Sequence, residues 1–205
     1  MRFKGYLDHI IPFRYEATTF LILYKFAAAR YDEFEKNFTE NEEAVMYPYN
    51  HLFSPLRIRS MQLKNRVVMS PMGSNYAKSS GEMSREHIEY YRLRAAGGVG
   101  LIIMENVCVD YPKGANGTTQ LRLDQDCFMP PLYAFNEEMH RYGCCTAVQI
   151  NHAGCTAVPA RIGAAPVSAS ALPLADGSYT EALSREEILR IAAQYGKAAL
   201  RAKTA

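Results

Sequence analysis

Three continuous apolar runs, each followed by a segment of helical character, constrain the fold of this chain more than any other feature. The runs are NRVVMSPM (65–72), VGLIIMENVCV (99–109) and CTAVQINHAG (145–154). They lack the strict alternation of a strand with one wet face, so we expect strands that are buried on both faces. Strands of that kind alternating with helices predict a parallel sheet in an α/β fold.

The segments after these runs carry the signals of helix ends. Ser84 and Ser184 stand at N-cap positions, and Glu187 has the capping-box spacing to the second serine. The segment 129–143 has prolines near its start and a glycine at its end. We therefore expect helices over 84–97, 129–143 and 183–205, with irregular loops over 110–120 and 155–180.

Doubly wound sheets and barrels both fit this rhythm. No GxGxxG motif follows the first run, which argues against a dinucleotide-binding Rossmann domain. In a parallel barrel, the chemistry lies in the loops that follow the strands. The polar residues of this chain follow that rule, as PMGSN after the first run, ENVC near the end of the second, and Gln149, Asn151 and His152 in the third.

Charge and cysteine content narrow the class of partner and site. The net charge of +2, from 23 basic and 21 acidic residues, predicts neither a nucleic acid nor a membrane partner. The five cysteines are odd in number and form no CxxC pair, so we expect neither a disulfide framework nor a metal site. Reduced thiols favour a cytoplasmic protein, and we expect at least one of Cys144 and Cys145 to be buried.

Residues 1–46 differ in character from the rest, being aromatic and then acidic. Their apolar run, 17–29, is interrupted by Lys25 and is shorter than the ~20 residues of a membrane span. We interpret 1–46 as a helical extension or the product of a mis-assigned upstream start. The barrel portion is then 47–205.

Four segments resemble the old yellow enzyme family of NADH:flavin oxidoreductases. They are LFSPLRIRSMQLKNRVVMSPMG, GGVGLIIMENVCV, AVQINHAG and LSREEILRIAAQYGKAALRAK, in that order. PMGSNYA and IIMENVCV are most similar to the branch of 2,4-dienoyl-CoA reductases, enoate reductases and bile-acid-type enoate reductases. The resemblance implies a partial TIM (β/α)8 barrel, about its first three βα units, with FMN at the carboxyl ends of the strands.

The resemblance also implies which residues contact the flavin. Pro71, Met72 and Gly73 correspond to the first flavin-contacting segment, and Asn106 to a position near the flavin edge. Gln149 corresponds to the glutamine that hydrogen-bonds the pyrimidine ring, for which an amide offers both a donor and an acceptor. FMN and NAD(P)H are the implied cofactors, and an iron–sulfur cluster belongs only to larger relatives.

Other polar residues near the strand ends receive structural interpretations. Glu105 lies inside an apolar run and needs a partner, so we expect a structural pairing rather than catalysis. His152 is expected to shape the HAG turn. Cys155 stands where the family often has arginine, and Gly73 where some relatives have a redox-sensitive cysteine. The catalytic residues stay unknown.

The implied function is that of the N-terminal part of an FMN-dependent NAD(P)H:ene oxidoreductase. Its substrate would be a small molecule with an activated C=C bond, namely an enoate, an enoyl-CoA or an enone. Two alternatives stay open: an inactive or partner-completed half-barrel, and a different flavin- or phosphate-binding barrel. Because a TIM barrel needs ~250 residues, we expect the 205-residue chain to bind FMN weakly at best and to associate, which leaves a homo-oligomer open.

Overall fold

The computed structural model describes residues 49–117 and 119–205. The predicted helical extension over 1–46, with its apolar run and the boundary that follows it, lies outside the described residues. Within the described part, no helix combines the length and the apolar character needed to cross a bilayer.

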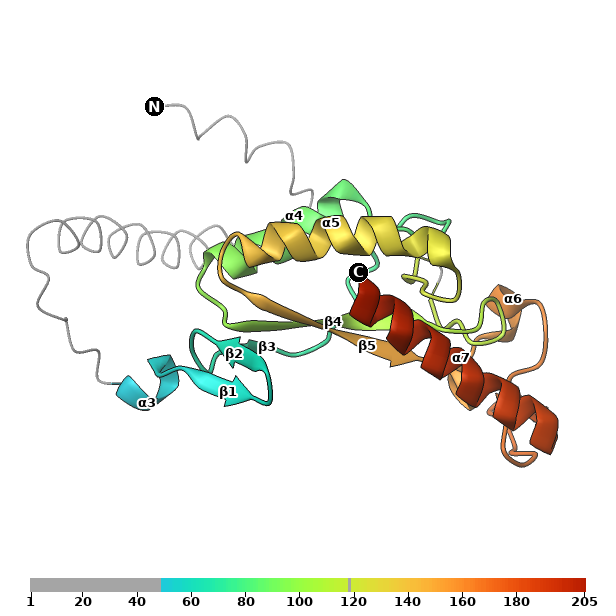
Figure 1. The fold of residues 1–205 in the computed structure, drawn as a ribbon. Coiled ribbons are helices and arrows are strands. Elements are labelled where there is room, and N and C mark those ends of the chain that lie inside the picture. Colours follow the sequence, from blue (N-terminus) through green and yellow to red (C-terminus); the bar gives the residue numbers. More distant parts are fainter. Residues whose placement is uncertain (1–48, 118) are drawn as a thin grey trace, which may run out of the picture. The chain divides into compact units, whose positions relative to one another are not determined.

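A three-stranded parallel sheet with the strand order β3-β4-β5 forms the centre of the fold (Figure 1). Its strands are β3 (Val68–Met69), β4 (Leu101–Cys108) and β5 (Cys145–Asn151). The three predicted parallel strands are therefore confirmed. The first is shorter than the apolar run because Pro71 has no N–H to continue a ladder.

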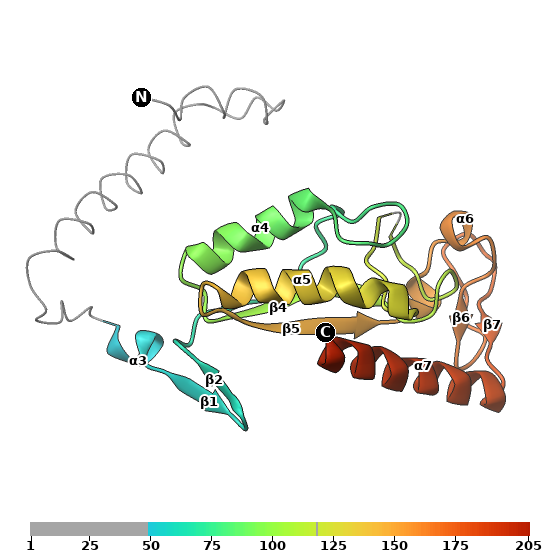
Figure 2. The ribbon, with the colours of Figure 1, turned by 45° about the horizontal axis from the view of Figure 1, so that its top comes forward.

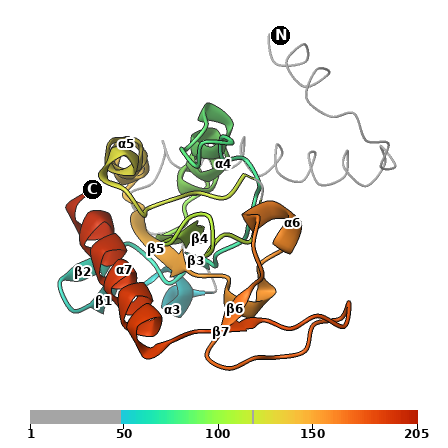
Figure 3. The same ribbon diagram turned by 90° about the vertical axis from the view of Figure 1, so that its right-hand side faces the viewer.

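Three helices pack on one side of this sheet and begin where the sequence predicts, although the second ends at His140 rather than at 143. Helix α4 (Arg85–Ala96) is capped by the Ser84 side chain, and α7 (Arg185–Thr204) begins with a capping box. Helix α5 (Met129–His140) has prolines in its first turn and follows the short η1 (Asp126–Phe128). Viewed along the strands, the three helices form an arc around one side of the sheet (Figure 3).

A short helix and a hairpin, which the sequence analysis did not predict, lie where β4 and β5 begin (Figure 2). They are α3 (Asn50–Phe53), β1 (Leu56–Ile58) and its antiparallel partner β2 (Met61–Leu63). Leu63 is fully buried, and the Lys64 ammonium donates a 2.6 Å hydrogen bond to the Tyr142 carbonyl. The hairpin therefore closes the amino-terminal end of the sheet.

The segment 155–180, predicted to be an irregular loop, contains regular structure, so that prediction was wrong in part. It carries most of η2 (Gly154–Thr156), α6 (Pro159–Ile162) and β6 (Val167–Ser168). Strand β6 pairs in parallel with β7 (Glu181–Ala182). Elements of two to four residues carry too little periodicity to be seen in a sequence.

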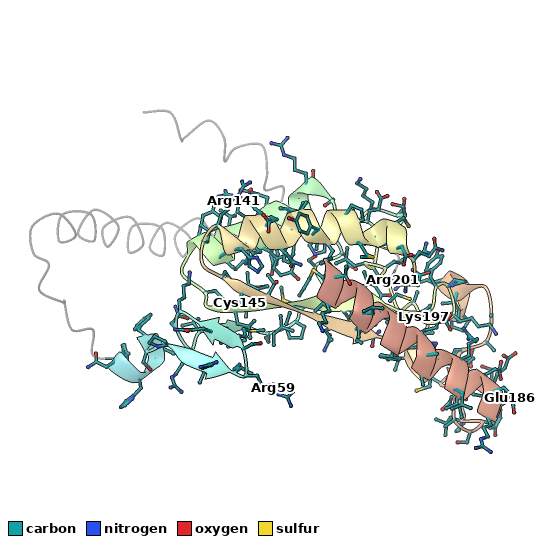
Figure 4. The ribbon with its side chains drawn as sticks, viewed as in Figure 1. Arg59, Arg141, Cys145, Glu186, Lys197 and Arg201 are labelled. Carbon is teal, nitrogen blue, oxygen red and sulfur yellow. The ribbon has the colours of Figure 1, made fainter. Side chains whose placement is uncertain are left out.

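The main core lies between the sheet and the three helices. Tyr91 of α4 and Phe135 of α5 are fully buried, with ring centroids 5.4 Å apart and edge to face. The prediction of a buried thiol is confirmed at Cys144, which is 1% exposed. Cys145 starts β5 beside the hairpin, and Arg201 ties α7 to Asp126 with a 2.6 Å contact (Figure 4).

Candidate functional site

A β-bulge at Glu105 decides which side chains of β4 face away from the helices. Met104 pairs with Val148 and Asn106 pairs with Gln149, so Glu105 is an extra residue in the ladder. A bulge of this kind shifts the phase of the strand. Beyond it Val107, rather than Asn106, joins Met104 in the helix-covered core.

Asn106 and Gln149 consequently lie side by side on the face of the sheet that the three helices leave open. They are direct partners in the parallel ladder, and neighbouring strands lie about 5 Å apart. Gln149 is exposed, and its neighbours Val148 and Ile150 pack against the core on the other face. The sheet thus presents two side-chain amides in a row near its carboxyl end.

The loop 70–76, which follows β3, extends this row. Pro71 is half-buried, Gly73 is exposed and Met72 is 54% exposed. A Cβ atom placed on Gly73 would lie 3.8 Å from Asn106 Oδ1 and 3.9 Å from Glu105 Oε2. The structure therefore brings the three predicted flavin-contacting segments together as one continuous strip.

A network of amide hydrogen bonds fixes the side chain of Asn106. Its Nδ2 donates to Asn116 Oδ1 at 3.0 Å, and the Asn116 N–H donates to Gln120 Oε1 at 2.9 Å. Arg161 Nη1 donates to the Asn116 carbonyl at 3.0 Å. Asn116, Gln120 and Arg161 were not among the residues predicted from the sequence. The many amide side chains in the loop after the second apolar run indicated a hydrogen-bond network, but they did not show that it holds Asn106.

Glu105 points away from the open face, toward α4. Its Oε1 lies 2.6 Å from His87 Nε2, and it also accepts hydrogen bonds from the Ser74 hydroxyl and backbone N–H. Burial alone raises the pKa of Glu105, but these hydrogen bonds outweigh burial and hold the pKa below its ordinary value of 4.5. The predicted structural pairing of Glu105 is confirmed, and its partner His87 was not foreseen.

His152 shapes the turn after β5, as predicted. Its Nδ1 accepts the Gly154 N–H at 3.1 Å, and its Nε2 lies 3.5 Å from Asp110 Oδ2. Arg190 of α7 binds both Asp110 oxygens at 2.9 Å. Burial lowers the pKa of His152 despite the nearby carboxylate, and the ring also rests against Gly114, where a Cβ would come within 2.8 Å of Cδ2.

The strip formed by Gly73, Asn106 and Gln149 has the chemistry that a flat heterocycle with mixed donors and acceptors requires. Gln149 offers both groups from an exposed side chain, and the Asn106 amide is held by its partner Asn116. The absence of a side chain at Gly73 leaves space beside Asn106. Within 49–117 and 119–205, no cluster of three or more His, Cys, Asp or Glu side chains is placed to bind a metal ion.

Comparison with known proteins identifies the family of the chain. Residues 51–205 match the NADH:flavin oxidoreductase / NADH oxidase family. An NADH oxidase of Thermoanaerobacter brockii is 43% identical over 162 residues, which cover 78% of this chain and 25% of that protein.

Two solved structures share the fold. An old yellow enzyme homologue from Zymomonas mobilis has a TM-score of 0.66 and 27% identity, over 74% of this chain and 45% of that chain. Morphinone reductase in complex with tetrahydroNAD has a TM-score of 0.67 and 29% identity, over 75% of this chain and 46% of that chain. The chain therefore spans less than half the length of these proteins, and the prediction of a partial TIM barrel is confirmed.

Proposed function

Because the chain belongs to the NADH:flavin oxidoreductase / NADH oxidase family, we propose that it supplies one wall of the FMN site of an NAD(P)H-dependent ene-reductase. The observation that carries this proposal is the strip formed by Gly73, Asn106 and Gln149 at the carboxyl ends of three neighbouring strands. In parallel barrels the loops at that end form the active site.

The residues of the strip would hold the flavin in complementary ways. The exposed Gln149 amide would donate and accept hydrogen bonds from the open face, and Asn106 presents an amide fixed by Asn116. Met72, which is 54% exposed, offers soft apolar surface to a flat ring, and Gly73 lets the backbone approach it. When bound, FMN supplies hydride transfer from NAD(P)H to an activated C=C bond.

The substrate class and the cellular location are finer parts of the same proposal. The similarity of the loop 70–76 to the enoate reductase branch supports an enoate, enoyl-CoA or enone. The five cysteines of the chain are free thiols, which supports a reducing compartment such as the cytoplasm. The proton donor is left unassigned.

FMN titration of the chain, followed by two-dimensional NMR, tests the proposal. We expect the backbone signals of Gly73, Asn106 and Gln149 to shift together at millimolar FMN. Gln149→Leu should weaken this response at least tenfold, which corresponds to about 1.4 kcal/mol. The matched control Gln62→Leu, at an exposed position of β2, should leave it unchanged. An absence of shifts, or shifts scattered over the surface, would contradict the proposal.

A second candidate is a half-barrel that a partner chain completes. Val68 on the open face is 45% exposed, and Leu189 and Leu200 of α7 are 60% and 65% exposed. Further βα units would cover such side chains. Light scattering of the purified chain checks this candidate, since a monomer at micromolar concentration would contradict self-completion.

A further inference from the structure

We propose that His87 and Glu105, the positioning pair, set the conformation of the loop 70–76 and thereby the presentation of Gly73 and Asn106. The inference rests on the proposed function, because the loop 70–76 is expected to contact the flavin. Neither member of the pair belongs to the strip, so both would act through the residues that they hold.

The positioning pair is buried, and both oxygens of the Glu105 carboxylate have donors nearby. The side chains of His87 and Glu105 are 0% and 4% exposed, and Nε2 lies 2.6 Å from Oε1. A buried carboxylate is costly unless donors surround it. Here the Ser74 hydroxyl reaches Oε1 at 3.1 Å, and the Ser74 backbone N–H donates to Oε2.

The positioning pair is in turn fixed by α4. Tyr91, one helical turn after His87, stacks on its ring at a centroid distance of 5.3 Å. The Tyr91 hydroxyl accepts the Glu105 N–H at 3.0 Å. A bulged residue is left out of the strand ladder, so α4 holds both the backbone and the side chain of the residue that makes the bulge.

The orientation of the imidazole follows from the same contacts. Within the described part of the chain, neither buried ring nitrogen of His87 has a hydrogen bond of regular geometry, but Nε2 lies 2.6 Å from Glu105 Oε1. This proximity favours the tautomer of a neutral ring that carries its proton on Nε2. His87 thus holds the carboxylate in the rotamer that reaches Ser74.

Ser74 connects the positioning pair to the flavin-side strip. It directly follows Gly73, where a Cβ atom would lie 3.8 Å from Asn106 Oδ1 and 3.9 Å from Glu105 Oε2. The bulge at Glu105 also turns Asn106 toward the open face. One residue therefore positions two neighbouring parts of the strip, from the side of the sheet that a cofactor does not reach.

Amide hydrogen exchange by NMR on the 205-residue chain tests this role without flavin. In Glu105→Leu, which fills the space without accepting hydrogen bonds, we expect the Ser74 amide to exchange at least tenfold faster. The amides of Ile102 and Val148 should change less than threefold, because local opening leaves the sheet intact. In Glu105→Gln, the amide oxygen can still accept the Ser74 N–H if the amide nitrogen faces His87, whose proton then has to move to Nδ1. We therefore expect the Ser74 amide to exchange more slowly in Glu105→Gln than in Glu105→Leu. Glu89→Gln, an exposed carboxylate on α4, is the control for charge loss.

A second variant covers the case in which Glu105→Leu fails to fold. Ser74→Ala removes the hydroxyl that contacts Glu105 and that also accepts the Tyr76 N–H at 3.3 Å. We expect faster exchange at the Tyr76 amide, which is in an exposed residue and loses this acceptor. Unchanged exchange at Tyr76 in Ser74→Ala would overturn the proposal. Equal acceleration at Ser74, Ile102 and Val148 in a folded Glu105→Leu variant would also overturn it, because the pair would then be a general stabiliser.

FMN titration separates this inference from the proposed function. The FMN concentration that shifts the Gly73 signal should rise at least tenfold in Glu105→Leu and by a smaller factor in Glu105→Gln. If the parent chain shows no FMN response, the proposed function fails while the exchange data still decide the role of the pair. If FMN binds but Glu105→Leu leaves both the exchange and the titration unaltered, only the positioning role is overturned.

Discussion

The two faces of the parallel sheet differ sharply in what covers them. On the helix-covered face, Ile102, Met104 and Val107 of β4 are 0%, 2% and 2% exposed. On the open face, Asn106 is half-buried and its ladder partner Gln149 is exposed. A single bulge at Glu105 keeps these two sets of side chains on opposite sides.

This contrast suggests that one face of the sheet stabilises the fold and that the other face binds the flavin. The covered face buries large apolar side chains against α4, α5 and α7, and such burial dominates the free energy of unfolding. The open face holds the half-buried Asn106 and the exposed Gln149. An exposed amide contributes little to the free energy of unfolding of the chain without flavin. Substitutions on the two faces should therefore differ in what they change.

Phe135→Ala should have the largest effect on stability. Phe135 is fully buried against Tyr91, and its truncation leaves a cavity, so we expect a loss of about 3–5 kcal/mol in the free energy of unfolding. Urea denaturation followed by circular dichroism measures this loss. Tyr133→Ala, on the exposed side of the same helix, is the control and should cost under about 0.5 kcal/mol. Similar losses of unfolding free energy in the two variants would contradict the assignment of stability to the covered face.

Ser84→Ala tests the helices that make the covered face. The Ser84 hydroxyl accepts the His87 N–H at 3.0 Å, and the loss of such a cap costs about 1 kcal/mol. Ser80→Ala, in the exposed turn before α4, is the matched control and should be nearly neutral. The same urea measurement applies, and equal midpoints for the two variants would show that the cap is not needed once α4 is packed.

The pH dependence of stability tests the carboxyl end of β5. Burial lowers the pKa of His152 from its ordinary 6.5, so the unfolded chain binds a proton more readily than the folded one. The contribution of His152 is therefore fully present above pH 6.5 and is lost as the pH falls toward its folded pKa, with a slope below about 1.4 kcal/mol per pH unit. His152→Asn should flatten the stability profile below pH 6.5. An unchanged slope would mean that His152 is protonated equally in both states.

Gln149→Leu should have the smallest effect on stability. Because Gln149 is exposed on the open face, we expect the free energy of unfolding to change by under about 0.5 kcal/mol, although FMN binding should weaken at least tenfold. Chemical denaturation without flavin gives the comparison. A loss above about 1 kcal/mol would show that the open face also supports the fold.

Much of the covered side of the molecule was predictable from local patterns. Continuous apolar runs identified β3, β4 and β5, and the serines before α4 and α7 identified where those helices begin. These features depend on neighbouring residues and on burial, both of which leave a signature in the order of side chains. The position of the Glu105 carboxylate inside an apolar run likewise predicted that it has a hydrogen-bonding partner.

Other features depend on residues that are distant in the sequence. The bulge at Glu105 exists only in the pairing of β4 with β5, and the hairpin β1–β2 gains its burial from the end of the sheet that it closes. The partner of Glu105 was hidden because His87 meets it only when α4 packs against the sheet. Contacts between residues that are distant in the sequence leave no local sequence pattern.

The sequence by itself therefore determined the three parallel strands, the three main helices, the class of fold and the three segments expected to meet a flavin. Only the tertiary structure decided that Gly73, Asn106 and Gln149 form one strip, and that His87 and Ser74 converge on Glu105 behind it. The physical reason is range: periodicity and caps act over a few residues. Strand register and buried polar pairing, in contrast, are set by contacts between segments that only folding brings together.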